Sequence, residues 1–186
     1  MEDALDAGWT LERILSEKTL DEIIELDRAS FSRPWTPAMF LTAVRSVHEF
    51  HLYALRRTHQ SALAGFLCYG LATDTLQIAT IAIRADLRRQ GLGAMLINFA
   101  LDEAARAGAR EATLDVRVSN LAARRLYHRM GFVPVALRPR HYDIPIEDGL
   151  TYACSIVLAG RSSERKRLRR MEDVALAFGP ADDGPT

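Results

Sequence analysis

A strand-like segment, an arginine-rich turn and a helix-like segment follow one another in the middle of the chain. The apolar run at residues 78–83 is typical of a buried strand, and residues 94–107 have helical periodicity. Between them lies Arg88-Arg89-Gln90-Gly91-Leu92-Gly93. Backbone N–H groups at a helix start lack intrahelical acceptors, and glycine lets a ligand approach the backbone closely. The segment therefore predicts a cradle for an anion such as phosphate, although an ordinary strand-to-helix turn has similar glycines.

Hydrophobic periodicity over the rest of the chain predicts one mixed α/β domain. Strands are expected at residues 9–14, 50–55, 62–71, 75–83, 111–118, 132–137 and 151–158, and helices at residues 19–30, from Thr36, at 92–107 and from Asn120 to Met130. The strands between residues 50 and 83 form an antiparallel meander. The strand–helix–strand order of residues 75–118 is a crossover, which implies one parallel pair of strands.

The ends of the chain differ in composition from the middle. Residues 1–8 are expected to be a loose lead-in, and residues 9–160 the folded domain. The tail at residues 161–186 begins with a basic run and ends with Asp182-Asp183-Gly184-Pro185-Thr186, a composition typical of partial disorder. The basic run favours a solvated helical face over a contact with nucleic acid or the ribosome.

Composition excludes several function classes. The 186 residues carry no formal net charge, which argues against nucleic acid or a membrane as a partner. No apolar run approaches the ~20 residues of a membrane span, and the acidic N-terminus does not resemble a signal peptide. Cys68 and Cys154 lack metal-ligand spacing and are expected to be buried free thiols. The expectation is a cytoplasmic protein without a metal.

A second motif follows the anion cradle about thirty residues later. Its pattern, N-x-x-A-x-x-L-Y-x-x-x-G-F, is formed by Asn120, Ala123, Leu126, Tyr127, Gly131 and Phe132. With Arg88, Gly91 and Gly93, these residues resemble the GCN5-related N-acetyltransferase (GNAT) superfamily. Residues 31–35 (Phe-Ser-Arg-Pro-Trp), 81–83 and 114–120 are most similar to the bacterial ribosomal-protein-alanine N-acetyltransferases, the RimI group. The resemblance covers roughly residues 10–158.

The resemblance implies both a fold and a cosubstrate. The fold is a single GNAT-type α/β (α+β) domain with a mixed, mostly antiparallel central sheet flanked by helices, in which a splayed parallel strand pair holds acetyl-CoA. Backbone groups of Ile81, Ala82 and Ile83 would bind the thioester and pantetheine. The pyrophosphate would bind at Arg88, Arg89, Gln90, Gly91, Leu92, Gly93 and Ala94. Asn120 would hold the cofactor arm, although a helix N-cap is the alternative role for its side chain.

The resemblance makes Tyr127 the general acid for the coenzyme A thiolate. Proton transfer from a phenol with a pKa of ~10 to a thiolate whose thiol has a pKa of ~8.5 is mildly uphill. A hydrogen bond to the thiolate would therefore matter as much as full proton transfer. The alternative for Tyr127 is an aromatic residue packed in the core.

Asp115 stands where the RimI group has the glutamate expected to act as a base. Its side chain is one methylene shorter, which favours a relay through water. An α-amine with a pKa of ~8 is roughly a tenth neutral at pH 7, whereas a lysine with a pKa of ~10.4 is almost fully charged. A weakly placed carboxylate therefore suits an α-amine better. The alternatives are a solvated strand carboxylate at Asp115 and a weaker candidate base at Glu111.

The function implied is acetyl transfer from acetyl-CoA to a protein N-terminal α-amine, by direct attack in a ternary complex. The resemblance points to the N-terminal alanine of a small-subunit ribosomal protein. A lysine or small-molecule amine as acceptor, and a non-catalytic acetyl-CoA-binding module, remain as alternatives. Phe31 and Trp35 would wall the acceptor site or anchor the core, and His141-Tyr142 resembles the family's loop beside the peptide. The oligomeric state and the role of the tail are open.

Overall fold

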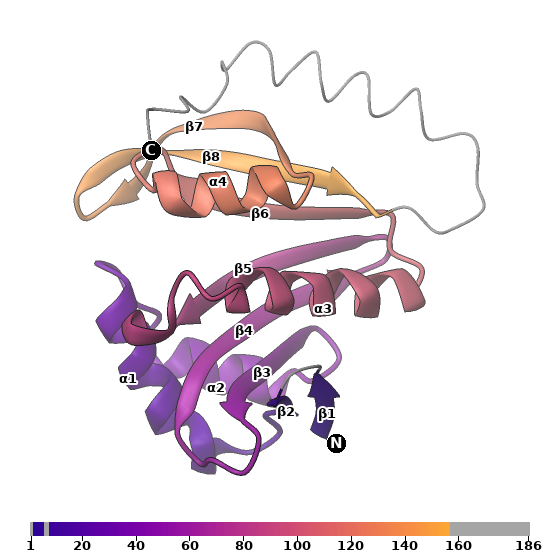
Figure 1. The fold of residues 1–186 in the computed structure, drawn as a ribbon. Coiled ribbons are helices and arrows are strands. Elements are labelled where there is room, and N and C mark those ends of the chain that lie inside the picture. The colour runs from indigo at the N-terminus through magenta and orange to yellow at the C-terminus, as the bar shows by residue number, and fades with distance from the viewer. Residues whose placement is uncertain (1, 6–7, 157–186) are drawn as a thin grey trace. The chain divides into compact units, whose positions relative to one another are not determined.

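The computed structural model describes residues 2–5 and 8–156, which divide into two compact units (Figure 1). The first unit comprises residues 1–72 and 77–100, and the second comprises residues 73–76 and 101–186. Each unit is a sheet with its own helices. The division passes through β5 (Thr75–Ile83) and α3 (Leu92–Arg106), so both elements contribute to both units.

The first unit is built on strands in the order β1 (Glu2–Leu5), β2 (Trp9–Arg13), β3 (Phe50–Arg57), β4 (Leu63–Ala72) and β5. Pairing is antiparallel from β1 to β4. The expectation of a loose lead-in is wrong for residues 2–5, which form β1. Gly8, with φ of +83°, adopts the left-handed conformation that lets the chain reverse and pair with β2.

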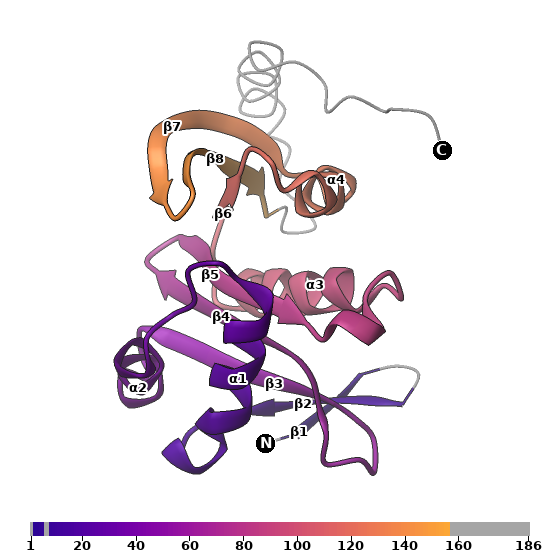
Figure 2. The same ribbon diagram turned by 90° about the vertical axis from the view of Figure 1, so that its left-hand side faces the viewer.

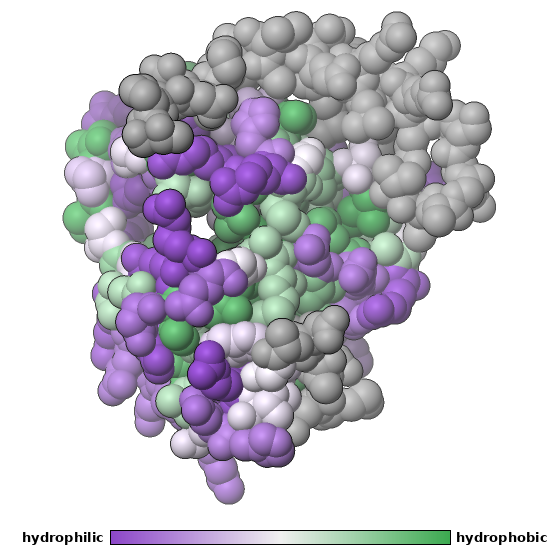
Figure 3. All heavy atoms as spheres, in the orientation of Figure 1, coloured by the Kyte–Doolittle hydropathy of each residue, from purple (hydrophilic) through white to green (hydrophobic). Residues whose placement is uncertain are grey.

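Helices α1 (Leu20–Ser30) and α2 (Pro37–Arg45) cover one face of β3 and β4 (Figure 2). Helix α1, preceded by the short 3₁₀ turn η1 (Glu17–Thr19), buries its apolar stripe, and hydrophilic residues gather over α1 in Figure 3. Helix α2 begins as the sequence predicts, with the Thr36 hydroxyl accepting the Met39 N–H and Pro37 at the first position.

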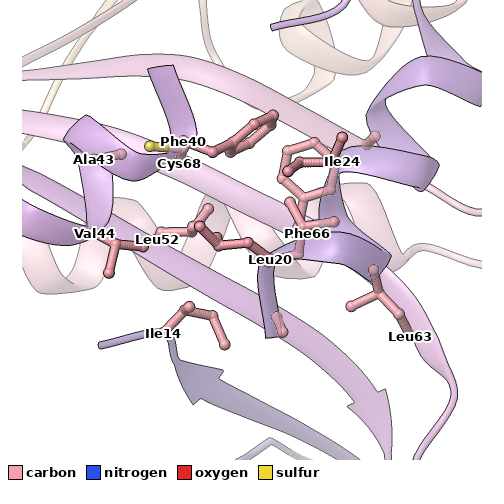
Figure 4. Packing of buried hydrophobic residues seen from close by; sticks show 13 residues of the cluster. Ile14, Leu20, Ile24, Phe40, Ala43, Val44, Leu52, Leu63, Phe66 and Cys68 are labelled. Atoms are coloured by element: carbon pink, nitrogen blue, oxygen red, sulfur yellow. The ribbon is translucent and has the colours of Figure 1, made fainter. Parts of the chain in front are cut away.

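Alternating residues of β3 divide the core of this unit between the two faces of its sheet. Leu52 joins Phe40, Phe66 and other buried side chains under α1 and α2 (Figure 4). Ala54 belongs to the same cluster. On the opposite face, Tyr53 meets Phe99 of α3 edge-on, with ring centroids 4.8 Å apart. The first unit is therefore a three-layer arrangement of helices, sheet and helix.

The second unit holds a sheet with the order β6 (Glu111–Arg117), β8 (Ile146–Ser155) and β7 (Val133–Asp143), all antiparallel. Helix α4 (Leu121–Arg129) connects β6 to β7 and ends at Gly131, whose φ is +83°. Strand β6 alternates as predicted: Leu114 and Val116 are buried, while Asp115 and Arg117 belong to the polar face.

Strand β7 is longer than predicted and continues past Leu137 to Asp143. Consequently His141 and Tyr142, expected in a loop, lie in a strand, and β8 begins at Ile146 instead of Thr151. The predicted strand ended at Leu137, and the observed one also includes Pro139, which cannot donate to a sheet. Strand β7 is the last strand of this unit's sheet, and its pairing shifts register between Arg138 and Tyr142, so the proline is tolerated.

Candidate active site

Asp115 is held by residues of two neighbouring strands. Its Oδ1 accepts a hydrogen bond from the Thr151 hydroxyl at 2.6 Å, and its Oδ2 lies 2.7 Å from Nη1 of Arg138. His141 Nε2 is 3.8 Å from the same Oδ2. The Asp115 side chain is 22% exposed and therefore reachable by water. Both of its oxygens are engaged, so the carboxylate has a fixed position and a proton reaches it along a restricted set of directions.

Arg117 organises the outer end of the same polar face. Its guanidinium lies 3.2 Å from the carboxylate of Glu147 and 4.2 Å from the centre of the Tyr142 ring. It also donates to the backbone carbonyls of Ile144 and Pro145. Glu147 in turn accepts the Ser119 N–H at 2.6 Å. These contacts fix the β7–β8 turn against the end of β6.

Tyr127 lies on α4 with only 7% of its surface exposed. Its ring neighbours are Phe132 and Tyr152, both with centroids 6.1 Å away. Burial raises the pKa of Tyr127 to about 12, with a smaller contribution from Tyr142. Burial also raises the pKa of Tyr142, and the charge of Asp115 adds to that effect. Asp115, Tyr142 and Tyr127 thus form one electrostatically connected group within the second unit.

Asn120 is the N-cap of α4. Its Oδ1 accepts the Ala123 N–H at 3.1 Å, so this oxygen is already used for capping. A cofactor contact by Asn120 therefore falls to its amide NH₂ group. Asn120 can therefore serve both as the helix N-cap, through Oδ1, and as a cofactor ligand, through its NH₂ group.

The anion cradle is in the first unit, after the 3₁₀ turn η2 (Ala85–Leu87). Arg89 and Gly91 adopt left-handed conformations, with φ of +66° and +85°. The Met95 N–H donates to the Gly91 carbonyl at 3.0 Å. Because that bond opens the helical series, the N–H groups immediately before Met95 have no intrahelical acceptor. The geometry fits a bound pyrophosphate.

The side chains of this cradle differ in their roles. The Arg88 Nε donates to the Ile83 carbonyl at 3.0 Å, which ties the turn to the end of β5. Arg89, Gln90 and Gly91 are exposed, whereas Leu92 is buried. The exposed backbone leaves its N–H groups accessible to a ligand. The buried Leu92 side chain keeps the start of α3 in place.

Close packing brings Gly65 of β4 against residues 82–83 of β5. A Cβ atom at Gly65 would lie 2.7 Å from the Ala82 carbonyl oxygen and 2.6 Å from the Ile83 side chain. Only glycine allows this approach of two strands. The segment predicted to bind the thioester is thus supported by a neighbouring strand that has no side chain there.

Gly65→Ala is expected to lower the free energy of unfolding by about 2–3 kcal/mol, because the new methyl group meets a backbone oxygen that cannot move freely. Gly70→Ala in the same strand is the matched control, since its nearest neighbour would be 3.4 Å away. Denaturant unfolding midpoints measure both effects. Equal midpoints for the two variants would contradict this account.

Residues 31–35, here called the aromatic loop, connect α1 to α2. Trp35 stacks at a tilt on Phe40, with centroids 5.1 Å apart, and packs against the core cluster. Phe31 is 36% exposed. Of the two roles foreseen for these aromatics, Trp35 therefore anchors the core, and Phe31 is available to a ligand.

Asp27 of α1 closes the aromatic loop and was not predicted. Its carboxylate accepts the Trp35 N–H at 2.7 Å and lies 3.5 Å from the Thr80 hydroxyl. The residue is 1% exposed. Burial raises its pKa from 3.8 to about 6, against the lowering effect of these two hydrogen bonds. The sequence signal for a buried carboxylate was the position of Asp27 in the apolar stripe of α1, three residues after Ile24.

The stability gained by Asp27→Asn is expected to depend on pH. The folded state binds the Asp27 proton more tightly than the unfolded state, so the wild type loses stability as pH rises from 3.8 through about 6. Relative to the wild type, the variant is expected to gain about 2 kcal/mol between pH 4 and pH 7. Urea unfolding of both proteins across this range measures the difference. A difference that does not change with pH would show that Asp27 has no raised pKa.

Sequence reasoning also missed Arg138 and Thr151. Thr151 is directly opposite Asp115 in the β6–β8 pairing. That partnership follows from strand register, which the sequence does not specify. Glu111, the weaker candidate base, lies four residues before Asp115 on the same strand, about 13 Å along it.

Within residues 2–5 and 8–156, no cluster of metal-ligating side chains occurs. No helix in those ranges has the length and apolar character needed to cross a membrane.

Comparison with known proteins identifies the class. The model of the acetyltransferase (GNAT) family matches residues 20–132. The chain belongs to this family, and it is an acetyl-CoA-dependent N-acetyltransferase with the mixed α/β fold predicted from its sequence.

Several of the similar proteins are named as ribosomal-protein alanine N-acetyltransferases. The chain is 32% identical over 131 residues to a Bacillus subtilis protein provisionally named a ribosomal protein bS18-alanine N-acetyltransferase; the match covers 70% of this chain and 85% of that protein. It is 30% identical over 129 residues to the bS18-alanine N-acetyltransferase of Salmonella typhimurium, covering 69% and 84%. The crystal structure of the Escherichia coli ribosomal-protein-S18-alanine N-acetyltransferase aligns with a TM-score of 0.73 at 27% identity, covering 83% and 97%.

Proposed function

We propose that this enzyme acetylates a protein N-terminal α-amine, and that its acceptor is the N-terminal alanine of a small-subunit ribosomal protein. The proposal is supported by the names of the relatives, which act on ribosomal protein bS18. A cytoplasmic location would follow from that substrate and stays a prediction.

The observation that carries the choice of an α-amine is the state of Asp115. Both carboxylate oxygens already accept hydrogen bonds, from Thr151 and Arg138. A carboxylate so engaged has few lone-pair directions left for an incoming proton. It suits an α-amine, of which about a tenth is neutral at pH 7, better than lysine, of which less than about one part in a thousand is neutral.

In the proposed mechanism the amine attacks the thioester directly within a ternary complex. Asp115 accepts a proton through a water molecule, and Tyr127 donates to the departing thiolate. Backbone groups of Ile81–Ile83 hold the thioester, and the N–H groups of residues 89–94 hold the pyrophosphate. The amide of Asn120 holds the cofactor arm. Neither cysteine takes part, because Cys68 and Cys154 are buried.

A pair of peptides tests the acceptor class. Both carry the same sequence with an internal lysine; one has a free N-terminal alanine and the other has that amine blocked. The free peptide is expected to react at least about 100-fold faster, since only its amine is substantially neutral. Equal rates would favour a lysine acetyltransferase, and tight acetyl-CoA binding without turnover on any amine would favour a binding module. Variation of the first residue then tests the preference for alanine.

A further inference from the structure

Asp27 and Thr80 stand apart from the rest of the buried residues. Apart from tyrosines, they are the buried residues with a charged or hydroxyl side chain among the described residues of known burial. They also face each other, with 3.5 Å between Asp27 Oδ1 and the Thr80 hydroxyl. Burying a carboxylate is unfavourable, and an apolar residue at this position of α1 would pack without that cost. A purely structural account of Asp27 is therefore weak.

The backbone and the side chain of Asp27 bind opposite ends of the aromatic loop. Its carbonyl accepts the Phe31 N–H at 3.0 Å, and its carboxylate accepts the Trp35 N–H at 2.7 Å. The loop thus begins and ends on one residue. This arrangement holds the backbone of Phe31, whose side chain is exposed, while the Trp35 ring packs on Phe40.

The Asp27 carboxylate also connects the aromatic loop to β5, because it contacts both the Trp35 N–H and the Thr80 hydroxyl. Thr80 immediately precedes Ile81, the first residue of the segment that would bind the thioester. Asp27, Thr80 and the aromatic loop all belong to the first unit. A displacement of Asp27 would therefore move the loop relative to residues 81–83.

We propose that Asp27 is a positioning residue for the acceptor, because it fixes the aromatic loop, and with it Phe31, at a set distance from the β5 segment. This inference rests on the proposed function in assuming that the loop contacts the acceptor. Asp27 touches neither substrate and acts through the loop.

The test compares Asp27→Ala with Asp27→Asn. Alanine removes the acceptor for the Trp35 N–H, whereas asparagine keeps an oxygen in its place. Asp27→Ala is expected to raise the KM for the acceptor peptide at least about tenfold and to leave the Kd for acetyl-CoA within about twofold. Asp27→Asn is expected to restore a KM close to that of the wild type. Asp21→Ala, at an exposed carboxylate of the same helix, is the matched control.

A second readout follows the loop without any acceptor. The chain has two tryptophans, so a Trp9→Phe background leaves Trp35 as the sole fluorescent reporter. Acrylamide quenching of Trp35 is expected to increase in Asp27→Ala and to stay unchanged in Asp27→Asn. Unchanged quenching and unchanged KM in a folded Asp27→Ala protein would overturn the proposal, as would an Asp27→Asn protein as impaired as the alanine variant.

The two readouts separate this inference from the proposed function. If the wild type shows no preference for a free α-amine, the proposed function fails, while the quenching result still reports whether Asp27 fixes the loop. If the wild type has that preference but Asp27→Ala retains its KM, the positioning role alone fails.

Discussion

Tyr127→Phe is expected to lower kcat by about 100-fold or more while the Kd for acetyl-CoA stays within about threefold. The departing thiolate develops negative charge in a site of low dielectric, where one hydrogen-bond donor has a large effect. With a pKa of about 12, Tyr127 would give up its proton to a thiolate whose thiol has a pKa of ~8.5 only at considerable cost. Its contribution is therefore chiefly a hydrogen bond, which phenylalanine removes without leaving a cavity.

Single-turnover acetyl transfer at saturating acetyl-CoA measures this effect. The matched control is Tyr152→Phe, since Tyr152 is also a buried tyrosine of the second unit and its hydroxyl meets Arg124 at 3.4 Å. Because the raised pKa keeps Tyr127 protonated, kcat is expected to show no alkaline loss from this group below about pH 10. A Tyr127→Phe variant that retains half of the wild-type kcat would exclude Tyr127 from the chemistry.

Asp115→Ala is expected to lower kcat/KM by about 100-fold at pH 7, a typical effect of losing a general base. The loss should shrink as pH rises toward 9, because an α-amine with a pKa of ~8 becomes neutral without help. The change also removes the partner of Arg138 and the acceptor of the Thr151 hydroxyl.

Profiles of kcat/KM from pH 6 to pH 9.5 distinguish a base from a positioning group. Thr151→Val is the matched control, since it loosens the Asp115 carboxylate without removing it. If Asp115→Ala lowers kcat/KM by the same factor at every pH, Asp115 only organises its neighbours. Full activity at pH 7 would remove it from the mechanism altogether.

Local patterns in the sequence were sufficient to identify most of the described elements. The alternation of β6 correctly put Asp115 on the polar face, and Thr36 and Asn120 were recognised as N-caps. These features depend on residues close together in the chain. Tyr127 was found by its motif, while the structure adds its burial and the resulting pKa of about 12.

Features that depend on pairing between distant strands could not be foreseen. The contacts of Asp115 with Arg138 and Thr151 join residues 23 and 36 positions away. The part of β7 beyond Leu137 contains Pro139, which a strand tolerates at the edge of a sheet, and edge position is a property of the whole sheet. Asp27 was overlooked because a single carboxylate in an apolar helix stripe is ordinarily read as a solvated residue. The tail at residues 161–186 lies outside the described residues.

The burial of both cysteines has a practical consequence for measuring this enzyme. Cys68 and Cys154 are buried in the structure, and burial raises the pKa of each thiol to about 12. Thiols react as thiolates, so neither is expected to react with a thiol-specific dye while the protein is folded. Each acetyl transfer releases one coenzyme A with a free thiol. A continuous colorimetric assay should therefore count turnovers without a background from the enzyme, even at the high enzyme concentrations needed for the slow variants.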